Sequence, residues 1–315
     1  FRLARIKTKN NLIQSEARPG SVASNAFYRL VYGDRSIFGY NPAGNRETID
    51  NITIDDLKSY YEKNFSPSSA KILISGKISK EQALSILNPL AEQWKGKEVR
   101  QISWPQPVAP EKSVIYFIDI PGSRQSVVYA GYPCISRTNP DYVKIDFINY
   151  RLGGAFTSIL NQILREEKGY TYGASSYLPE MRSVAPFTAS TSVRSDATYE
   201  TVRIIREELE KYGSSLSDAD ISFIKNCMIR SNALRFETND ALAGMLSTMA
   251  KYGFPADYIK NEENIIRNMT LEDSRAVASK YIRPDKMYYL VVGDAATQLG
   301  SLEKIGFGKP VLIER

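Results

Sequence analysis

Two side chains of this sequence, Arg165 and Tyr172, have types and a spacing that suit chemistry on a peptide carbonyl group. A guanidinium offers five N–H donors and keeps its charge, and a phenol adds one O–H donor. Such donors stabilise a carbonyl oxygen, or the oxyanion that forms when water attacks the carbonyl carbon. The alternative is structural: Arg165 complements the negative end of a helix and Tyr172 fills a core. The pattern by itself favours the structural alternative, because arginine is common at helix ends.

A helix, a turn and a strand are expected to position these two side chains. The helix is indicated by apolar residues at helical spacing, namely Phe156, Ile159, Leu160, Ile163 and Leu164. Gly169 is expected to end it, because glycine adopts a positive φ without strain. Residues 170–172 favour extended backbone. Arg165 would then lie on the last helical turn, and Tyr172 on the first residues of the strand.

Histidine is absent from all 315 residues. This absence removes the commonest metal ligand and the commonest base at neutral pH, and it excludes a Ser-His-Asp triad within the chain. The two cysteines, Cys134 and Cys227, are too few for a thiolate zinc site or a disulfide scaffold. We expect both to be small buried residues, and the sequence leaves a single bridge between them open.

Adjacent acidic residues occur as Glu166-Glu167 and Glu207-Glu208. Neighbouring positions on a helix point about 100° apart, so neither pair converges on one ion. We expect these carboxylates to be solvated and predict no metal site in this chain.

The net charge of +6 comes from 41 basic and 35 acidic residues that are interspersed. Nucleic-acid binding calls for a basic stripe with stacking aromatics, so we expect no nucleic-acid partner. A run of about 18 apolar residues is also missing, so we expect no transmembrane segment.

The coarse pattern predicts an α+β chain. Helices are predicted over 21–32, 53–64, 79–94, 139–152, 199–212, 217–236, 238–251 and 257–267, and strands over 71–75, 113–119, 125–132, 174–178 and 186–193. The apolar stripe in residues 241–249, which contains Met245 and Met249, is expected to pack in a core and not to form a binding groove. Three prolines between residues 96 and 112 predict a stiff connector.

Part of the sequence occurs twice. One offset of 217 positions joins residues 51–56 (NITIDD) with 268–273 (NMTLED), Pro67 with Pro284, and Gly76 with Gly293. A period this long indicates a duplicated domain and not a solenoid. We therefore predict the back half of a first repeat in residues 1–95, a linker in residues 96–112, and a complete second repeat in residues 113–315. Because the sequence begins at Phe1 and not at a methionine, we expect a piece of a longer polypeptide.

Residues 164–176 (LREEKGYTYGASS) resemble the signature of the second half of M16-family zinc peptidases, the pitrilysin and mitochondrial-processing-peptidase group. Arg165 and Tyr172 match an Arg and a Tyr that contact substrate in bacterial members. Leu152-Gly153-Gly154 also resembles a family segment, in which close helix packing needs no side chain. The resemblance implies two homologous LuxS-like metallopeptidase repeats, each an antiparallel-rich sheet with helices on one face. The first repeat would be incomplete.

The family holds zinc through a His-x-x-Glu-His motif and a later Glu, and the motif is missing here. Glu16, the one acidic residue of the first 20, is expected to be a surface charge. The resemblance implies a peptidase fragment or non-catalytic subunit, inactive by itself, that binds peptide or unfolded polypeptide and forms half of an enclosing chamber. Zinc would come only from an upstream segment or an M16-like partner subunit. The alternative is a purely structural subunit, like the core proteins of the cytochrome bc1 complex. The sequence does not set the compartment, although the bacterial cell envelope or periplasm is favoured over the cytoplasm.

Overall fold

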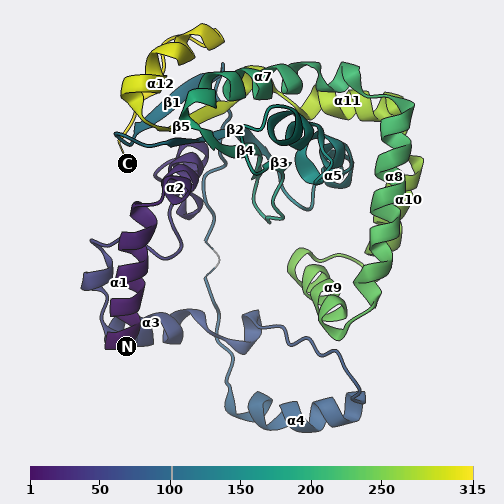
Figure 1. Cartoon of the computed structure of the whole chain (residues 1–315). Coiled ribbons are helices and arrows are strands. Elements are labelled where there is room, and N and C mark those ends of the chain that lie inside the picture. The colour runs from purple at the N-terminus through teal and green to yellow at the C-terminus, as the bar shows by residue number, and fades with distance from the viewer. Residues whose placement is uncertain (101, 315) are drawn as a thin grey trace.

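A computed structural model describes residues 1–100 and 102–314 of the chain (Figure 1). The helices are α1 (Arg2–Glu16), α2 (Pro19–Tyr32), α3 (Ile54–Asn64), α4 (Lys80–Gln93), α5 (Tyr142–Asn149), α6 (Ile159–Asn161), α7 (Thr198–Ser215), α8 (Asp218–Asn232), α9 (Asn239–Tyr252), α10 (Tyr258–Asn268), α11 (Leu271–Tyr281) and α12 (Ala295–Leu302). The strands are β1 (Val114–Asp119), β2 (Gln125–Ile135), β3 (Ala174–Tyr177), β4 (Ala185–Arg194), β5 (Tyr288–Gly293) and β6 (Val311–Leu312). The prediction of an α+β chain is confirmed.

The strands form one mixed sheet in the order β3-β4-β2-β5-β1-β6. β1 is parallel to β5 and β6, with Val114 opposite Tyr288, and the other neighbours are antiparallel. β3 and β4 correspond to the hairpin predicted over residues 174–193, and they pair antiparallel as expected. The sheet is built entirely from residues 114–312, and β5 lies between β2 and β1 at its centre.

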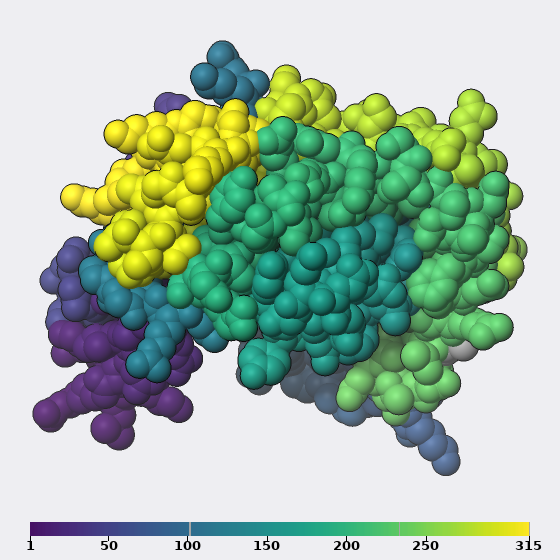
Figure 2. All heavy atoms as spheres, turned by 45° about the horizontal axis from the view of Figure 1, so that its top comes forward, coloured from purple at the N-terminus to yellow at the C-terminus, as the bar shows by residue number. Residues whose placement is uncertain are grey.

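Helices α5, α7 and α11 lie on one face of this sheet. The core on that face joins α5, α7 and α11 to the strands through fully buried side chains, among them Phe117, Phe147, Phe187, Ile205 and Tyr289. The surface of this helical side is continuous, and the N-terminal residues project at one edge (Figure 2). The helices on this side therefore fix the position of the strands and of the loops that join them.

Helix α2 covers the opposite face of the sheet. Its residues Val22, Phe27 and Val31 are buried against Ile118 of β1 and Leu290 of β5. The ring of Phe27 also lies 5.1 Å from the ring of Tyr129 of β2 (Figure 1 shows α2 beneath the sheet). Residues that the repeat assigns to the first domain thus complete the core of the second.

The predicted strand over residues 71–75 is wrong. This segment has no regular structure and pairs with no strand in the described part of the chain. Its side chains Ile72, Leu73 and Ile74 are exposed. β-forming residues favour extended backbone, but a strand also needs a neighbour to accept and donate its backbone hydrogen bonds. The preceding helix α3 likewise has no buried residue among those described.

The local structure around residue 53 occurs again around residue 270. Thr53 accepts a hydrogen bond from the amide of Asp56, whose carboxylate accepts from the Thr53 amide. Thr270 and Asp273 form the same capping box at α11. A short 3₁₀ turn then follows each helix, at Pro67–Ser69 and Pro284–Lys286. The repeated sequence letters thus have the same backbone form at both places.

Residues 102–110 lead from the N-terminal helices to the sheet and contain no helix or strand. Their extended course agrees with a proline-stiffened connector, and the boundaries of the two repeats stay a prediction. Among the described residues, no helix is both long and apolar enough to span a bilayer.

Candidate functional site

Arg165 lies in a π-helical turn, Gln162–Glu167, that follows the short helix α6. The amide of Lys168 donates to the carbonyl of Ile163, five residues earlier, at 3.0 Å. The wider turn is an irregularity that the helical spacing did not predict. π-Helical turns of this kind are rare and occur frequently at functional sites.

Phe156 is not part of this helix, contrary to the prediction from its spacing. The helix begins at Ile159, after Ser158 at the N-cap position. Phe156 therefore lies in the preceding loop with 69% of its surface exposed, and its ring lies beneath the Arg165 guanidinium, 4.4 Å from the carbon of that group. Sequence reasoning missed this contact, although a serine five residues after Gly153 is a helix-start signal.

The turn after Arg165 is closed by backbone hydrogen bonds. Gly169 has φ +62° and donates to the carbonyl of Arg165 at 3.1 Å. Tyr170 donates to the carbonyl of Leu164 at 2.9 Å. The prediction that a positive-φ glycine ends this helix is confirmed. The chain reverses within a few residues, so the segment that carries Tyr172 leaves directly from the end of the Arg165 turn.

Tyr172 is not on a strand, because β3 begins two residues later at Ala174. The hydroxyl of Thr171 accepts from the amide of Gly173 at 3.0 Å, and this bond bends the backbone around Tyr172. Thr191 of β4 donates to Thr171 at 3.0 Å and fixes the bend to the sheet. The Tyr172 side chain is consequently 96% exposed, so it does not fill a core.

Asn161 holds both sides of this region together. Its side chain is buried, and its amide nitrogen donates to the carbonyl of Phe156 at 2.7 Å. Its amide oxygen accepts from the backbone N–H of Ala174 at 3.1 Å. One residue therefore ties the loop that carries Phe156 to the residue that follows the Tyr172 bend.

Gly153 packs closely against β3, the strand that follows the Tyr172 bend. A Cβ at Gly153 would overlap the backbone nitrogen of Ser176. Asn149 donates to the carbonyl of Ser176 at 2.8 Å and accepts from its hydroxyl. The Gly-Gly pair allows this close approach, as the resemblance implied, although the helix continues through it as a π-helical turn, Tyr150–Gly154.

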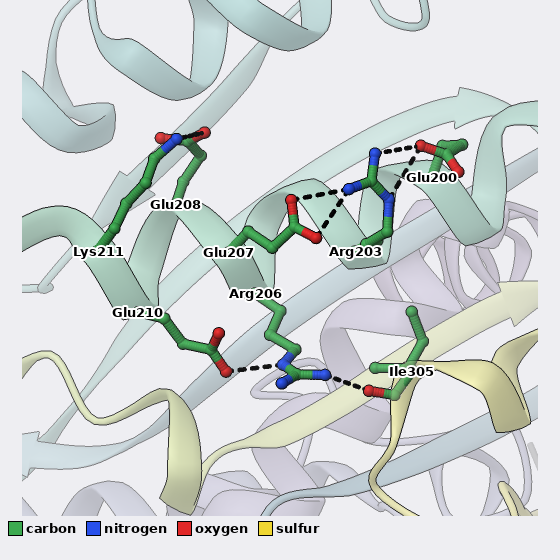
Figure 3. A network of polar contacts seen from close by, with 8 residues as sticks. All are labelled: Glu200, Arg203, Arg206, Glu207, Glu208, Glu210, Lys211 and Ile305. Carbon is green, nitrogen blue, oxygen red and sulfur yellow. Dashed lines mark hydrogen bonds and ion pairs between the residues drawn. The ribbon is translucent and has the colours of Figure 1, made fainter.

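The second pair of adjacent carboxylates, Glu207 and Glu208, lies on α7, where each forms an ion pair (Figure 3). Glu207 accepts from Arg203 at 2.7 Å, and Glu208 pairs with Lys211 at 2.7 Å. The two carboxylates have different partners, as the geometry of a helix requires. Glu208 is buried and not solvated, which corrects the expectation for that residue. Of the first pair, Glu166 pairs with Arg165 at 3.4 Å.

The described residues, 1–100 and 102–314, contain no group of three or more histidine, cysteine, aspartate or glutamate side chains that could hold a metal ion. Glu16 is exposed and pairs with Arg46 at 3.4 Å. The thiols of Cys134 and Cys227 are both free and half-buried. Burial raises the pKa of Cys134 to about 11, so this thiol is protonated near neutral pH.

The geometry around Arg165 and Tyr172 thus offers hydrogen-bond donors on a rigid support. The Arg165 side chain is about one-third exposed, and Glu166 is its ion-pair partner among the described side chains, at a distance too long for a strong hydrogen bond. The phenol of Tyr172 faces solvent.

Known proteins share this fold and parts of this sequence. An uncharacterized zinc protease of Streptomyces coelicolor is 22% identical over 275 residues, which are 85% of this chain and 59% of that protein. A non-peptidase homolog of Helicobacter pylori is 25% identical over 264 residues, which are 80% of this chain and 58% of that protein. The chain therefore spans about six-tenths of the length of these curated relatives.

A solved peptidase M16 inactive domain from Pseudomonas fluorescens superimposes with a TM-score of 0.85 at 23% identity. The match covers 94% of this chain and 71% of that one, and it shows a common fold. The sequence model of one family, described as the peptidase M16 inactive domain, matches residues 51–228. Since that match covers more than half of its residues, this chain belongs to the peptidase M16 inactive domain family.

Proposed function

We propose that this chain is a non-catalytic M16 subunit or segment that binds unfolded polypeptide at Arg165 and Tyr172. It forms half of an enclosing chamber, and a zinc site in another segment or subunit cleaves the bound peptide. The observation that carries the proposal is the full exposure of the Tyr172 phenol beside a π-helical turn that presents a partly exposed guanidinium. The name of the non-peptidase relative in Helicobacter pylori agrees with a non-catalytic role.

The residues of this chain do not fit a zinc site of the family type. The sequence has no histidine to supply nitrogen ligands, and a catalytic zinc in a peptidase needs protein ligands that leave one position for water. The hydrolytic step is therefore assigned to a different polypeptide segment. What Arg165 and Tyr172 contribute is hydrogen bonding to peptide carbonyls, which orients the substrate and stabilises a developing oxyanion.

A binding measurement tests the proposal directly. The probe is reduced, carboxymethylated α-lactalbumin, a permanently unfolded polypeptide, labelled with fluorescein and followed by anisotropy. We expect Arg165→Ala to weaken binding about ten- to a hundredfold, because a hydrogen bond to a charged group contributes about 1.5–3 kcal/mol. Tyr172→Phe is expected to weaken it about two- to fivefold. Arg230→Ala and Tyr60→Phe, at other exposed positions, are the matched controls.

Unchanged binding by both site variants would remove the peptide-binding role and favour a structural subunit. In a complex that contains an intact zinc site, Arg165→Ala is expected to lower peptide turnover and to leave zinc content and folding unchanged. An intact His-x-x-Glu-His motif in the polypeptide encoded upstream would make the parent a peptidase, and a degenerate motif would make it a silent partner.

A further inference from the structure

The side chain of Arg151 has three hydrogen-bond partners from three parts of the chain. Its Nε donates to a carboxylate oxygen of Asp220, in the first turn of α8, at 2.8 Å. One terminal nitrogen donates to the backbone carbonyl of Thr157 at 2.8 Å and to the side-chain amide oxygen of Gln162 at 3.4 Å. Thr157 lies between the two π-helical turns, and Gln162 begins the second of them. The guanidinium therefore joins α8 to the loop and to the turn that carry the candidate site.

The ion pair between Arg151 and Asp220 is held firmly at its α8 end. The two side chains are 22% and 21% exposed, so solvent screens this pair less than one on the open surface. Ser217 donates to the other Asp220 oxygen through its amide at 3.1 Å and its hydroxyl at 2.6 Å. Burial alone would raise the pKa of Asp220, but the hydrogen bonds from Ser217 and Arg151 outweigh it and hold this pKa below its usual value. The ring of Phe223, one turn further along α8, lies 6.0 Å from the Arg151 guanidinium carbon.

The loop between the two turns carries Phe156, and side chains hold two of its consecutive carbonyls. Asn161 donates to the carbonyl of Phe156 at 2.7 Å, and Arg151 donates to the next carbonyl, that of Thr157. Asn161 thereby fixes the loop to the segment that leads into Arg165, and Arg151 fixes the loop to α8. The Phe156 ring is exposed, yet it lies 4.4 Å from the Arg165 guanidinium carbon. The position of this exposed ring thus depends on a backbone that is held at both carbonyls.

We propose that Arg151 and Asp220 are positioning residues of the candidate site, which fix the Phe156 ring under the Arg165 guanidinium. Arg151 holds the loop backbone next to the ring, and Asp220 holds the Arg151 side chain. Without either side chain, the loop keeps its bond from Asn161 but loses its tie to α8, so the ring becomes free to leave the guanidinium. A displaced binding group loses affinity even when its own chemistry is intact. The effect on peptide binding rests on the proposed function, whereas the effect on the ring does not.

Two variants remove the link in different ways. Arg151→Met keeps much of the length of the side chain and removes every donor, whereas Asp220→Asn removes the charge that holds Arg151. The matched control is Asp218→Asn, because Asp218 lies in the same first turn of α8 and is exposed. If Arg151→Met does not fold, Asp220→Asn still carries the test, since asparagine has nearly the same shape as aspartate.

The position of the ring is read by NMR from the Nε–H resonance of Arg165, which is identified by its loss in Arg165→Lys. An aromatic ring that lies against a guanidinium shifts the resonances of the guanidinium protons, and Phe156→Ala gives the value without the ring. We expect Arg151→Met and Asp220→Asn to move the resonance at least halfway toward that value, and Asp218→Asn to leave it in place. A resonance that neither site variant moves would overturn the proposal.

Binding of the labelled, unfolded α-lactalbumin gives the second measurement. Asp220→Asn should weaken binding about two- to fivefold in the parent chain and have no further effect in a Phe156→Ala background. Its effect on the free energy of unfolding should be nearly the same in both backgrounds, because that effect does not require the ring. An equal loss of binding in both backgrounds would show that Asp220 does not act through the ring and would overturn the proposal. A resonance that moves as expected, with binding unchanged in Arg165→Ala, would support the positioning and overturn the proposed function.

Discussion

The guanidinium carbon of Arg165 lies 4.4 Å from the centroid of the Phe156 ring. The ring restricts the long arginine side chain, and the attraction between a cation and an exposed ring contributes about 0.5–1 kcal/mol. The two residues come from different local structures, a loop and a π-helical turn, and Asn161 bonds to the backbone of that loop. The orientation of the charge therefore depends on Phe156 and Asn161 as well as on Arg165 itself.

Phe156→Ala is expected to weaken binding of the unfolded polypeptide about two- to fivefold, because the guanidinium loses the ring that orders it. In the double variant with Arg165→Ala, the second substitution should cost little more, since the two side chains act as one unit. Anisotropy measures both effects, and Phe236→Ala, at another exposed ring, is the control. Fully additive losses would show that the ring contact does not position the arginine.

Asn161→Ala is expected to lower the free energy of unfolding by about 1–3 kcal/mol. It removes the partners of the Phe156 carbonyl and of the Ala174 amide, and a buried backbone group without a partner is costly. The same variant should weaken peptide binding, because the Phe156 loop and the Tyr172 bend lose their common tether. Urea unfolding measures the first effect and anisotropy the second. Gln14→Ala, at an exposed position of α1, should change neither.

The stability of the chain is expected to fall in acid partly through Asp141. Hydrogen bonds from Lys280, Lys144 and Tyr281 hold the pKa of this carboxyl well below its usual range. A lowered folded pKa contributes stability that is fully present above the unfolded pKa of about 3.9 and is lost as the pH falls toward the folded value.

The Asp141→Asn variant is therefore expected to be less stable at pH 7 by about 1–2 kcal/mol, since the side chain is about one-fifth exposed and its bonds are charge-assisted. The deficit should shrink below about pH 4, where the wild-type carboxyl begins to lose its advantage. Urea unfolding at several pH values measures the difference, with Glu237→Gln as the control. A deficit that stays constant down to pH 2 would contradict the assignment.

Gly153→Ala and Gly244→Ala are expected to change stability in opposite directions. A Cβ at Gly153 overlaps Ser176, and such overpacking costs about 1–3 kcal/mol. A Cβ at Gly244, inside α9, meets no atom within 4 Å. Alanine there should raise the free energy of unfolding by about 0.5–1 kcal/mol, because glycine loses more entropy in a helix. Two variants with the same sign in denaturant unfolding would refute the packing argument.

Patterns along the sequence predicted the elements whose stability is local. The helix predicted from residue 53 begins after Thr53 in the structure, and Gly169 ends its helix at a positive φ. The strand over 71–75 was predicted from the same kind of signal and does not form. Its residues carry the propensity, but the ladder of hydrogen bonds depends on strands that lie elsewhere.

The functional role of Arg165 and Tyr172 stays a prediction, and the structure can be compared only with the geometry expected for them. The spacing of Arg165 and Tyr172 suggested a helix end and a strand start, yet Thr171 bends the chain before the strand begins. A side-chain hydrogen bond of this kind competes with regular pairing and leaves no periodic signal. Phe156 has the spacing of a helical apolar residue relative to Ile159 and Leu160, but it lies in the loop before the helix.

The packing of helix α2 against β5 has a consequence for folding during synthesis. Its buried face needs β5, whose last residue lies more than 250 positions later in the sequence. During synthesis, α2 leaves the ribosome long before the strands that cover Phe27 exist. Contacts this distant along the chain close slowly, so this side of the sheet completes late. A nascent chain halted before residue 288 should therefore attract chaperones that bind apolar helices, and release should follow once β5 emerges.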